Sequence, residues 1–106
     1  MHKGWSEAQI REAIRRTTDG VRAILGFVAA HPRCTSADIA DGLGLKSPRS
    51  VGPTLNALSR TAEEMGVFPR GEVRWFFEWH GKADGWEQYD FPEWVRQIVL
   101  DELGSS

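Results

Sequence analysis

Residues 47 to 60 read SPRSVGPTLNALSR and combine polar side chains that can contact nucleic acid with a regular apolar pattern. Asparagine can pair with adenine and arginine with guanine in the major groove, and serine or threonine can hydrogen-bond bases or phosphates. Val51, Leu55 and Leu58 recur every three or four residues, which predicts a helix with one buried face. We expect the helix to begin near Ser50, because Pro53 is tolerated only in a first turn.

The polar face of this helix, together with its entrance and one later lysine, supplies the candidate DNA-contacting side chains. Lys46 and Ser47 would hold phosphates near the helix entrance. A solvated surface with no ligand is the alternative, and it is favoured for a helix in isolation. The order of the surrounding elements, given below, favours contact with DNA. The candidates are Lys46, Ser47, Arg49, Ser50, Thr54, Asn56, Arg60 and Lys82.

Other residue types offer little chemistry. The single cysteine, Cys34, excludes an internal disulfide and a cysteine-based zinc site. His31 and Arg33 nearby could lower its thiol pKa, but a buried or incidental thiol is the favoured interpretation. The three histidines have no partner four residues away, so we expect no metal site. With no cofactor motif and no Ser/His/Asp set converging in sequence, we expect that the protein is not an enzyme.

Length and composition indicate one folded domain over residues 1–106. The chain is 41% apolar and 26% charged, far from the composition of a disordered segment. No apolar run approaches the roughly 18 residues that a membrane span needs, and the N-terminus lacks a signal-peptide core. We therefore expect a cytoplasmic protein without a membrane partner.

The charge is unevenly distributed along the chain. Residues 1–33 carry six Lys/Arg against three Asp/Glu, whereas residues 71–106 carry three against eight. The net charge of −2 still permits DNA binding if the acidic tail faces away. A basic flank is one possible use of the early cations, and pairing with Glu7, Glu12 and Asp19 is the other. Those cations are Lys3, Arg11, Arg15, Arg16 and Arg22.

Hydrophobic periodicity predicts helices through the first two thirds of the chain. The 6–31 region should form two helices, near 6–17 and 20–30, or one long bent helix. A short helix should follow with its N-cap near Thr35 and Asp38 in its first turn, ending at Gly42 or Gly44. The helix 50–66 should end at Gly66, a residue free to adopt the left-handed conformation.

The last third of the chain predicts a hairpin and a closing helix. We expect strands at 72–79 and 86–91, with the turn cluster 80–85 between them, and a helix over 92–103. The fold class is therefore α+β and mostly helical. With a helix-turn-helix at 36–66 and a hairpin at 72–91, the order is that of a winged helix-turn-helix domain with an extra N-terminal helix and a C-terminal helix.

The hairpin is aromatic and acidic. It carries Arg74 and Lys82 against four carboxylates, so a helix rather than the wing should make most contacts with DNA. Burial inside the monomer is the favoured role of its tryptophans, but exposed tryptophans are enriched at interfaces. Stacking of single-stranded bases is a third use, disfavoured by the negative charge along the hairpin. The candidate partner-interface residues are Trp75, Trp79 and Trp86.

Two resemblances follow from these motifs. The segment ADIADGLGL, followed by RSVG, resembles the helix-turn-helix of bacterial regulators and is similar to the DNA-binding segment of alkyltransferase-like proteins. In that family an arginine before the Val-Gly pair enters the duplex, which implies such a role for Arg49; the active-site Pro-Cys-His-Arg motif of alkyltransferases is missing here. Over residues 20–99, SVGPTLNALSR and YDFPE resemble small uncharacterised winged-helix proteins of actinobacteria, which implies the fold.

These observations lead to two functional hypotheses. The first is a sequence-reading double-stranded DNA-binding protein, a transcriptional regulator that works as a homodimer through helix 50–66. The alternative is a protein-protein interaction module that uses the aromatic, acidic hairpin and does not bind DNA.

Overall fold

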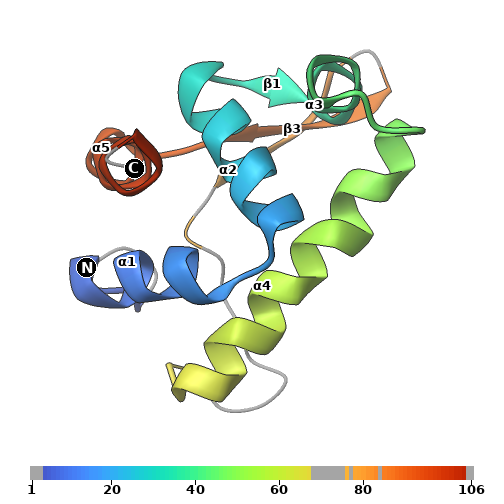
Figure 1. The fold of residues 1–106 in the computed structure, drawn as a ribbon. Coiled ribbons are helices and arrows are strands. Elements are labelled where there is room, and N and C mark those ends of the chain that lie inside the picture. Colours follow the sequence, from blue (N-terminus) through green and yellow to red (C-terminus); the bar gives the residue numbers. More distant parts are fainter. Residues whose placement is uncertain (1–3, 68–75, 77, 84, 105–106) are drawn as a thin grey trace.

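The computed structural model describes residues 4–67, 76, 78–83 and 85–104. The architecture is α+β and mostly helical, with five α-helices and a small three-stranded antiparallel sheet among these residues (Figure 1). The helices are α1 (Glu7–Arg16), α2 (Asp19–Ala30), α3 (Ser36–Leu43), α4 (Val51–Met65) and α5 (Glu93–Gly104), with a short 3₁₀ helix η1 (Pro48–Ser50) before α4. The strands are β1 (Cys34–Thr35), β2 (Glu78–Ala83) and β3 (Trp86–Asp90).

Local capping explains where most helices begin and end. The side chains of Ser6, Thr18 and Thr35 accept hydrogen bonds from backbone N–H groups at the starts of α1, α2 and α3. Gly44 and Gly66 end α3 and α4 in the left-handed conformation, as the sequence predicts. The expected first pair of helices is therefore confirmed as two separate helices, and so is the Thr35 cap.

α4 begins at Val51 with Ser50 as its N-cap residue, as predicted, but Ser50 does not cap it through its side chain. Ser50 has a helical backbone, and its side chain makes no capping hydrogen bond. The cap lies three residues earlier, where Ser47 Oγ accepts a hydrogen bond from the N–H of Arg49 and Pro48 begins η1. The 3₁₀ turn before α4 explains the difference, because the chain is already helical when it reaches Val51.

The sheet contains a strand that the sequence does not predict. β1 pairs with β3, and β3 pairs with β2, so the order is β1-β3-β2 and the predicted two-stranded hairpin is incomplete. β2 is described from Glu78 to Ala83, so most of the predicted turn cluster 80–85 is strand, and Phe76 of the predicted strand 72–79 lies in a bend. Ala83 pairs with Trp86, and Gly85 lies in the turn between the two strands. Residues 72–75 and 77 lie outside the described residues.

A bulge interrupts the hairpin. Trp79 pairs with Tyr89 and Lys82 with Glu87, so β2 has one more residue than β3 between these pairs. Gly81 lies in this interval with φ +83°, a conformation that glycine adopts without steric cost.

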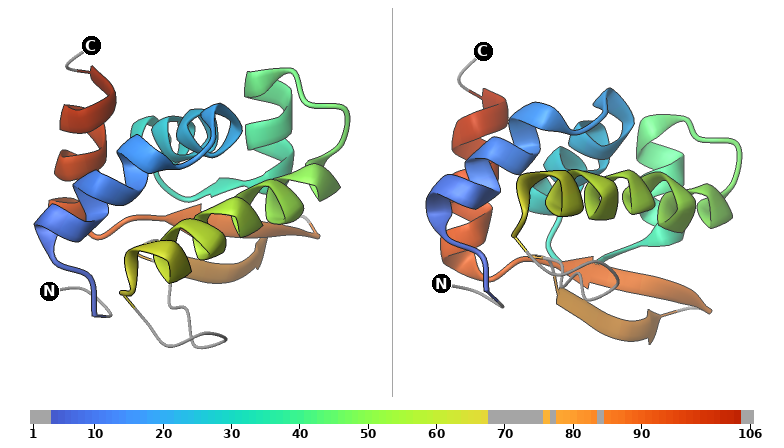
Figure 2. Two further views of the ribbon diagram at one scale, coloured as in Figure 1. Left: turned by 60° about the horizontal axis from the view of Figure 1, so that its bottom comes forward. Right: turned by 90° about the horizontal axis from the view of Figure 1, so that it is seen from below.

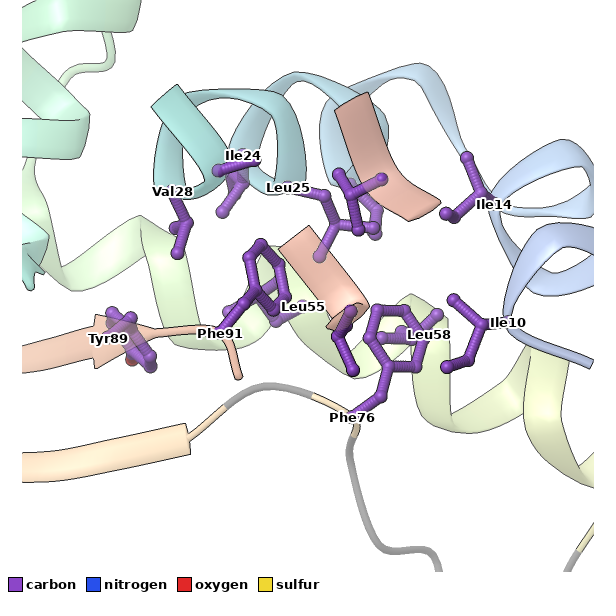
Figure 3. Packing of buried hydrophobic residues seen from close by; sticks show 14 of the residues in the cluster. Ile10, Ile14, Ile24, Leu25, Val28, Leu55, Leu58, Phe76, Tyr89 and Phe91 are labelled. Atoms are coloured by element: carbon purple, nitrogen blue, oxygen red, sulfur yellow. The ribbon is translucent and has the colours of Figure 1, made fainter. Parts of the chain in front are cut away.

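One apolar cluster joins the helices to the sheet, as the side chains in Figure 3 show. Helices α1, α2, α4 and α5 each contribute a buried face, and β3 contributes Tyr89. Trp5 is fully buried, and its ring meets Phe76 edge-on at a centroid distance of 5.1 Å. Phe76 in turn stacks near Phe91 at 6.2 Å. Phe76, two residues before β2, therefore contacts one ring from near the start of the chain and one from the residue after β3.

None of the described helices combines the length and the apolarity required to cross a membrane.

Candidate nucleic-acid interface

A groove lies between the amino-terminal end of α4 and the tip of the β2–β3 hairpin. Its volume is about 640 Å³, and one wall consists of residues from η1 and the first turn of α4. The two views in Figure 2 show the hairpin passing beneath this end of α4. The groove is lined by Pro48, Arg49, Gly52, Pro53, Lys82, Gly85, Trp86 and Glu87.

Two predicted DNA-contacting residues meet in this groove. Arg49 and Lys82 are 33 positions apart in the sequence, yet both line it, and both are exposed. The chain brings them together because the hairpin folds back toward the start of α4. Glu87 is the cross-strand partner of Lys82 in the hairpin register, but the two side chains form no ion pair.

Of the two uses considered for the early cations, pairing with nearby carboxylates is the one observed for the arginines of α1 and α2, while Lys3 lies outside the described residues. Arg11 contacts Glu7, Asp101 and Glu102, and Arg15 also contacts Glu102. Arg16 pairs with Glu12, and Arg22 pairs with Asp19. The acidic tail therefore does not face away from the basic N-terminal third, because α5 packs against α1 and its carboxylates pair with Arg11 and Arg15.

Arg22 has a further structural role. Its Nη1 donates to the carbonyl oxygens of Ile14, Arg15 and Thr17 at distances of 3.3, 3.2 and 2.7 Å. These carbonyls lie at the carboxyl end of α1, where the helix leaves acceptors unsatisfied and favours positive charge. The side chain thus caps α1 rather than presenting its charge to a ligand.

Four other cations differ from this group. Within the described part of the chain, Lys46, Arg49, Arg60 and Lys82 form no ion pair, and all four are exposed. All belong to α4, its entrance or the hairpin tip. The uncompensated positive charge of the predicted site is therefore concentrated on the α4 and hairpin side of the molecule.

The exposed stripe of α4 contains only part of the predicted set. Arg49, Pro53, Asn56 and Arg60 are spaced by four, three and four residues, share one helix face and are exposed. Glu63 and Glu64 continue the exposed surface at the carboxyl end of the helix. The stripe therefore changes from cationic to anionic along α4, and only its first three turns suit a polyanion.

The remaining predicted hydroxyl groups serve the fold. Ser50 Oγ donates to the carbonyl oxygen of Ser47 at 2.7 Å, and Thr54 Oγ1 donates to that of Ser50 at 2.8 Å. Thr54 also packs against α2. The Cγ2 atom of Thr54 lies 3.3 Å from the position that a Cβ atom at Gly20 would occupy. Ser47 caps η1. These three residues are half-buried, so the structure provides internal partners for each hydroxyl.

The three hairpin tryptophans proposed as partner contacts differ in how much of each the structure describes. Trp75 lies outside the described residues, and of Trp79 only the backbone pairing in β2 is described. Trp86 is half-buried and lines the groove beside Arg49 and Lys82. Sequence reasoning considered burial, partner contact and base stacking for Trp86 but did not place it beside Arg49, and it overlooked Pro48, Gly52 and Glu87. The Asp84-Gly85 dipeptide was the available signal, because this pair favours a two-residue hairpin turn.

Cys34 is not an activated nucleophile. Burial raises its pKa to about 12, and the carboxylates of Asp38 and Asp90 act in the same direction. The alternative of a pKa lowered by His31 and Arg33 is therefore contradicted, and the favoured interpretation of a buried thiol is confirmed. Among the residues that the structure describes, no three His, Cys, Asp or Glu side chains cluster as metal ligands.

Comparisons with protein-family models, with curated proteins and with solved structures find no match to this chain.

Proposed function

We propose that this protein binds double-stranded DNA through the exposed stripe of α4 and the tip of the hairpin, as a winged helix-turn-helix transcriptional regulator. The observation that carries the proposal is the meeting of Arg49 and Lys82 in one groove, with Asn56 and Arg60 continuing along the same exposed helix face. The arrangement would offer one cation on the hairpin to a phosphate and the helix side chains to base edges.

The distribution of charge supports this orientation. DNA binding depends on cations that are free to neutralise phosphates. Among the described residues, the arginines on α1 and the N-terminal turn of α2 are ion-paired, whereas the cations on the α4 and hairpin side, namely Lys46, Arg49, Arg60 and Lys82, are not. Glu63 and Glu64 disfavour close approach of DNA to the far end of α4. We therefore expect the amino-terminal end of α4 to enter the groove of DNA.

The element order also supports the winged helix-turn-helix proposal. α3 is joined to α4 through a short segment beginning at Gly44, and the hairpin follows. This is the order in which a second helix reads the major groove and a hairpin contacts the adjacent backbone. A homodimer would place two α4 helices about 34 Å apart on successive turns of DNA.

The test is a fluorescence-anisotropy titration with mixed-sequence duplex DNA at several salt concentrations. We expect wild-type affinity to fall steeply with salt, and Arg49→Ala and Lys82→Ala to weaken binding and each reduce the salt slope by about one. Arg15→Ala is the matched control, because it removes the same charge from the ion-paired α1–α5 face. It should leave binding nearly unchanged.

Two results would contradict the proposal. One is absence of binding even at low salt, which would favour the alternative of a protein-interaction module that uses the hairpin around Trp86. The other is equal weakening by Arg15→Ala and Arg49→Ala, which would show that only overall charge matters. Sedimentation of the protein on a palindromic duplex then tests the homodimer.

A further inference from the structure

We infer that the groove between α4 and the hairpin also binds a nucleotide unit, meaning an aromatic base that carries a phosphate. This inference goes beyond duplex recognition and does not depend on it. The groove combines an aromatic ring, two cations that form no ion pair with any described residue, and a carboxylate, and these groups belong to segments far apart in the sequence. Such a combination fits a planar anionic ligand rather than a duplex backbone alone.

The size and lining of the groove suit a base. Its volume of about 640 Å³ lies within the range of about 300–1,000 Å³ typical of small-molecule sites. Trp86 is half-buried on the hairpin wall, while Pro48 and Pro53 lie on the helix wall. An indole ring stacks on any base, and the proline rings provide an apolar surface opposite it.

The cations supply the phosphate contact. The guanidinium of Arg49 can bind a phosphate through two parallel hydrogen bonds, and the Lys82 ammonium adds a second positive charge. Neither side chain is ion-paired within the described ranges. Along the hairpin sequence alone the charge is negative, but α4 brings Arg49 to the groove. The negative charge of the hairpin, which disfavours base stacking, is therefore offset in the lining of this groove by Arg49 and Lys82.

Glu87 gives the ligand an orientation. Tyr89 Oη donates to Glu87 Oε2 at 2.5 Å, which restrains the carboxylate. An ionised carboxylate only accepts hydrogen bonds, so it would attract the amino group of a base or a ribose hydroxyl and repel the phosphate. We therefore expect the base to lie toward Glu87 and Trp86 and the phosphate toward Arg49.

Two other grooves lack this combination. The groove of about 520 Å³ between α1 and α5 contains Trp94 and Arg11, but three carboxylates already engage Arg11. The groove of about 410 Å³ near the end of α2 contains Phe27 and His31, but Asp38 and Asp41 face it from α3. A phosphate would compete with existing ion pairs in the first, and in the second two carboxylates oppose the one arginine of the lining, Arg33.

The experiment follows the indole N–H signals of the ¹⁵N-labelled protein by NMR during titration with adenosine 5′-monophosphate, without DNA. The Trp86 signal, assigned by its loss in Trp86→Phe, should shift and saturate. Adenosine alone and inorganic phosphate alone should each bind at least tenfold more weakly. A single-stranded hexadeoxyadenylate titration separates the two sources of the ligand: a lower Kd for the mononucleotide indicates a free nucleotide, and a lower Kd for the hexamer indicates a nucleotide within a strand.

Two variants locate the site. Arg49→Ala should raise the Kd at least fivefold, whereas Arg60→Ala, which removes a cation from the same exposed stripe outside the groove, should change it less than twofold. Gly52→Met should abolish binding by filling the groove, and it should fold normally because a Cβ at Gly52 meets no atom within 4 Å. A Trp86 signal that stays fixed with both titrants, or equal losses from Arg49→Ala and Arg60→Ala, would overturn the inference. Neither result would bear on duplex binding, which the anisotropy titration measures separately.

Discussion

Arg96 is the residue that most directly ties α5 to the rest of the fold. Its Nη1 donates to the carbonyl oxygen of Ala29 at the end of α2, and its Nη2 donates to Asp90 Oδ1 at the end of β3, both at 2.7 Å. The side chains of Arg96 and Asp90 are only 12% and 17% exposed. A charge-assisted contact in such an environment is costly to break, because the partner remains buried without compensation.

We expect Arg96→Ala to lower the free energy of unfolding by about 2–4 kcal/mol. Arg96→Lys should recover only part of this, because an ammonium cannot reproduce the planar fork that reaches both acceptors. Urea denaturation measures the free energy of unfolding of both variants. The control is Arg16→Ala, whose exposed pair with Glu12 should contribute less than about 1 kcal/mol. A loss for Arg96→Ala no larger than that of the control would contradict this role.

A second prediction concerns the ionisation of Cys34. Its pKa in the folded protein is raised to about 12 by burial, with Asp38 and Asp90 acting in the same direction, whereas an unfolded thiol titrates near 8.5. The folded state therefore keeps the proton while the unfolded state loses it, so the contribution to stability is complete below about pH 8.5 and declines as the pH rises toward 12.

Alkylation by iodoacetamide checks this directly. At pH 8.5 the folded protein should react on the order of 10²- to 10³-fold more slowly than the protein in denaturant. Cys34→Ala should also lose less stability than wild type between pH 9 and 11. Rapid alkylation of the folded protein would show that the thiol is accessible and not in the buried state described above.

At the scale of elements, the packing of α2 against α3 depends on a glycine, Gly42. A Cβ added at Gly42 would lie 2.1 Å from Cε2 of Phe27, closer than any real contact. The Phe27 ring is itself stacked on His31, with centroids 4.1 Å apart. The ring and α3 therefore fit together only because residue 42 is glycine.

We expect Gly42→Ala to destabilise the protein by about 1–3 kcal/mol, the usual cost of overpacking, despite the higher helix propensity of alanine. Phe27→Leu in the same chain should recover part of the loss by removing the ring atoms. Thermal unfolding of the two single variants and the double variant gives the coupling energy. Strictly additive effects would mean that the contact between the two residues is not the cause.

The elements also show which parts of the fold the sequence predicts. The helices follow from hydrophobic period, and their ends follow from Thr35, Gly44 and Gly66, because capping is a local interaction. β1 could not be predicted, since a two-residue strand has no period and exists only through its pairing with β3. The strand character of residues 80–83 could not be predicted either, because the bulge that carries β2 through them is specified by pairing rather than by composition.

At the scale of the whole molecule, the opposite charges of the two ends of the chain neutralise each other. Loss of hydration would raise the pKa of Glu102, but hydrogen bonds from Arg15 and Arg11 outweigh it and hold the pKa below its ordinary value. Arg11 correspondingly has a raised pKa, chiefly through its hydrogen bonds to Asp101 and Glu102. This network explains why a basic N-terminal third does not produce a basic face.

The fourth prediction follows from that network. Because the pKa of Glu102 is lowered in the folded state, its contribution to stability is present above the unfolded value near 4.3 and is lost as the pH falls through the folded value. Glu102→Gln should therefore unfold more easily than wild type at pH 7, and the difference should shrink in acid below about pH 4. Urea titrations across pH 3 to 7 measure it. A difference independent of pH would exclude the ion pairs as its source.

The candidate site was predictable only in part. Arg49, Asn56 and Arg60 are exposed as expected, because helical spacing decides which face is buried. Sequence spacing could not show that Thr54 has an internal acceptor, since a hydroxyl that bonds back within the helix leaves the same apolar pattern. Nor could it show that Lys82 would lie beside Arg49, because that proximity depends on the course of the hairpin.

The bulge in β2 has a consequence for how this groove can vary. Side chains alternate between the two faces of a strand, so a change of one residue in the pairing turns every side chain beyond it to the opposite face. The chain neighbours of Lys82 are Gly81 and Ala83, which carry no charge. Deleting the extra residue at the bulge would therefore remove the hairpin's cation from the groove while leaving every charged residue in the chain. A single insertion or deletion, rather than a substitution, is thus sufficient to switch the electrostatic character of this surface.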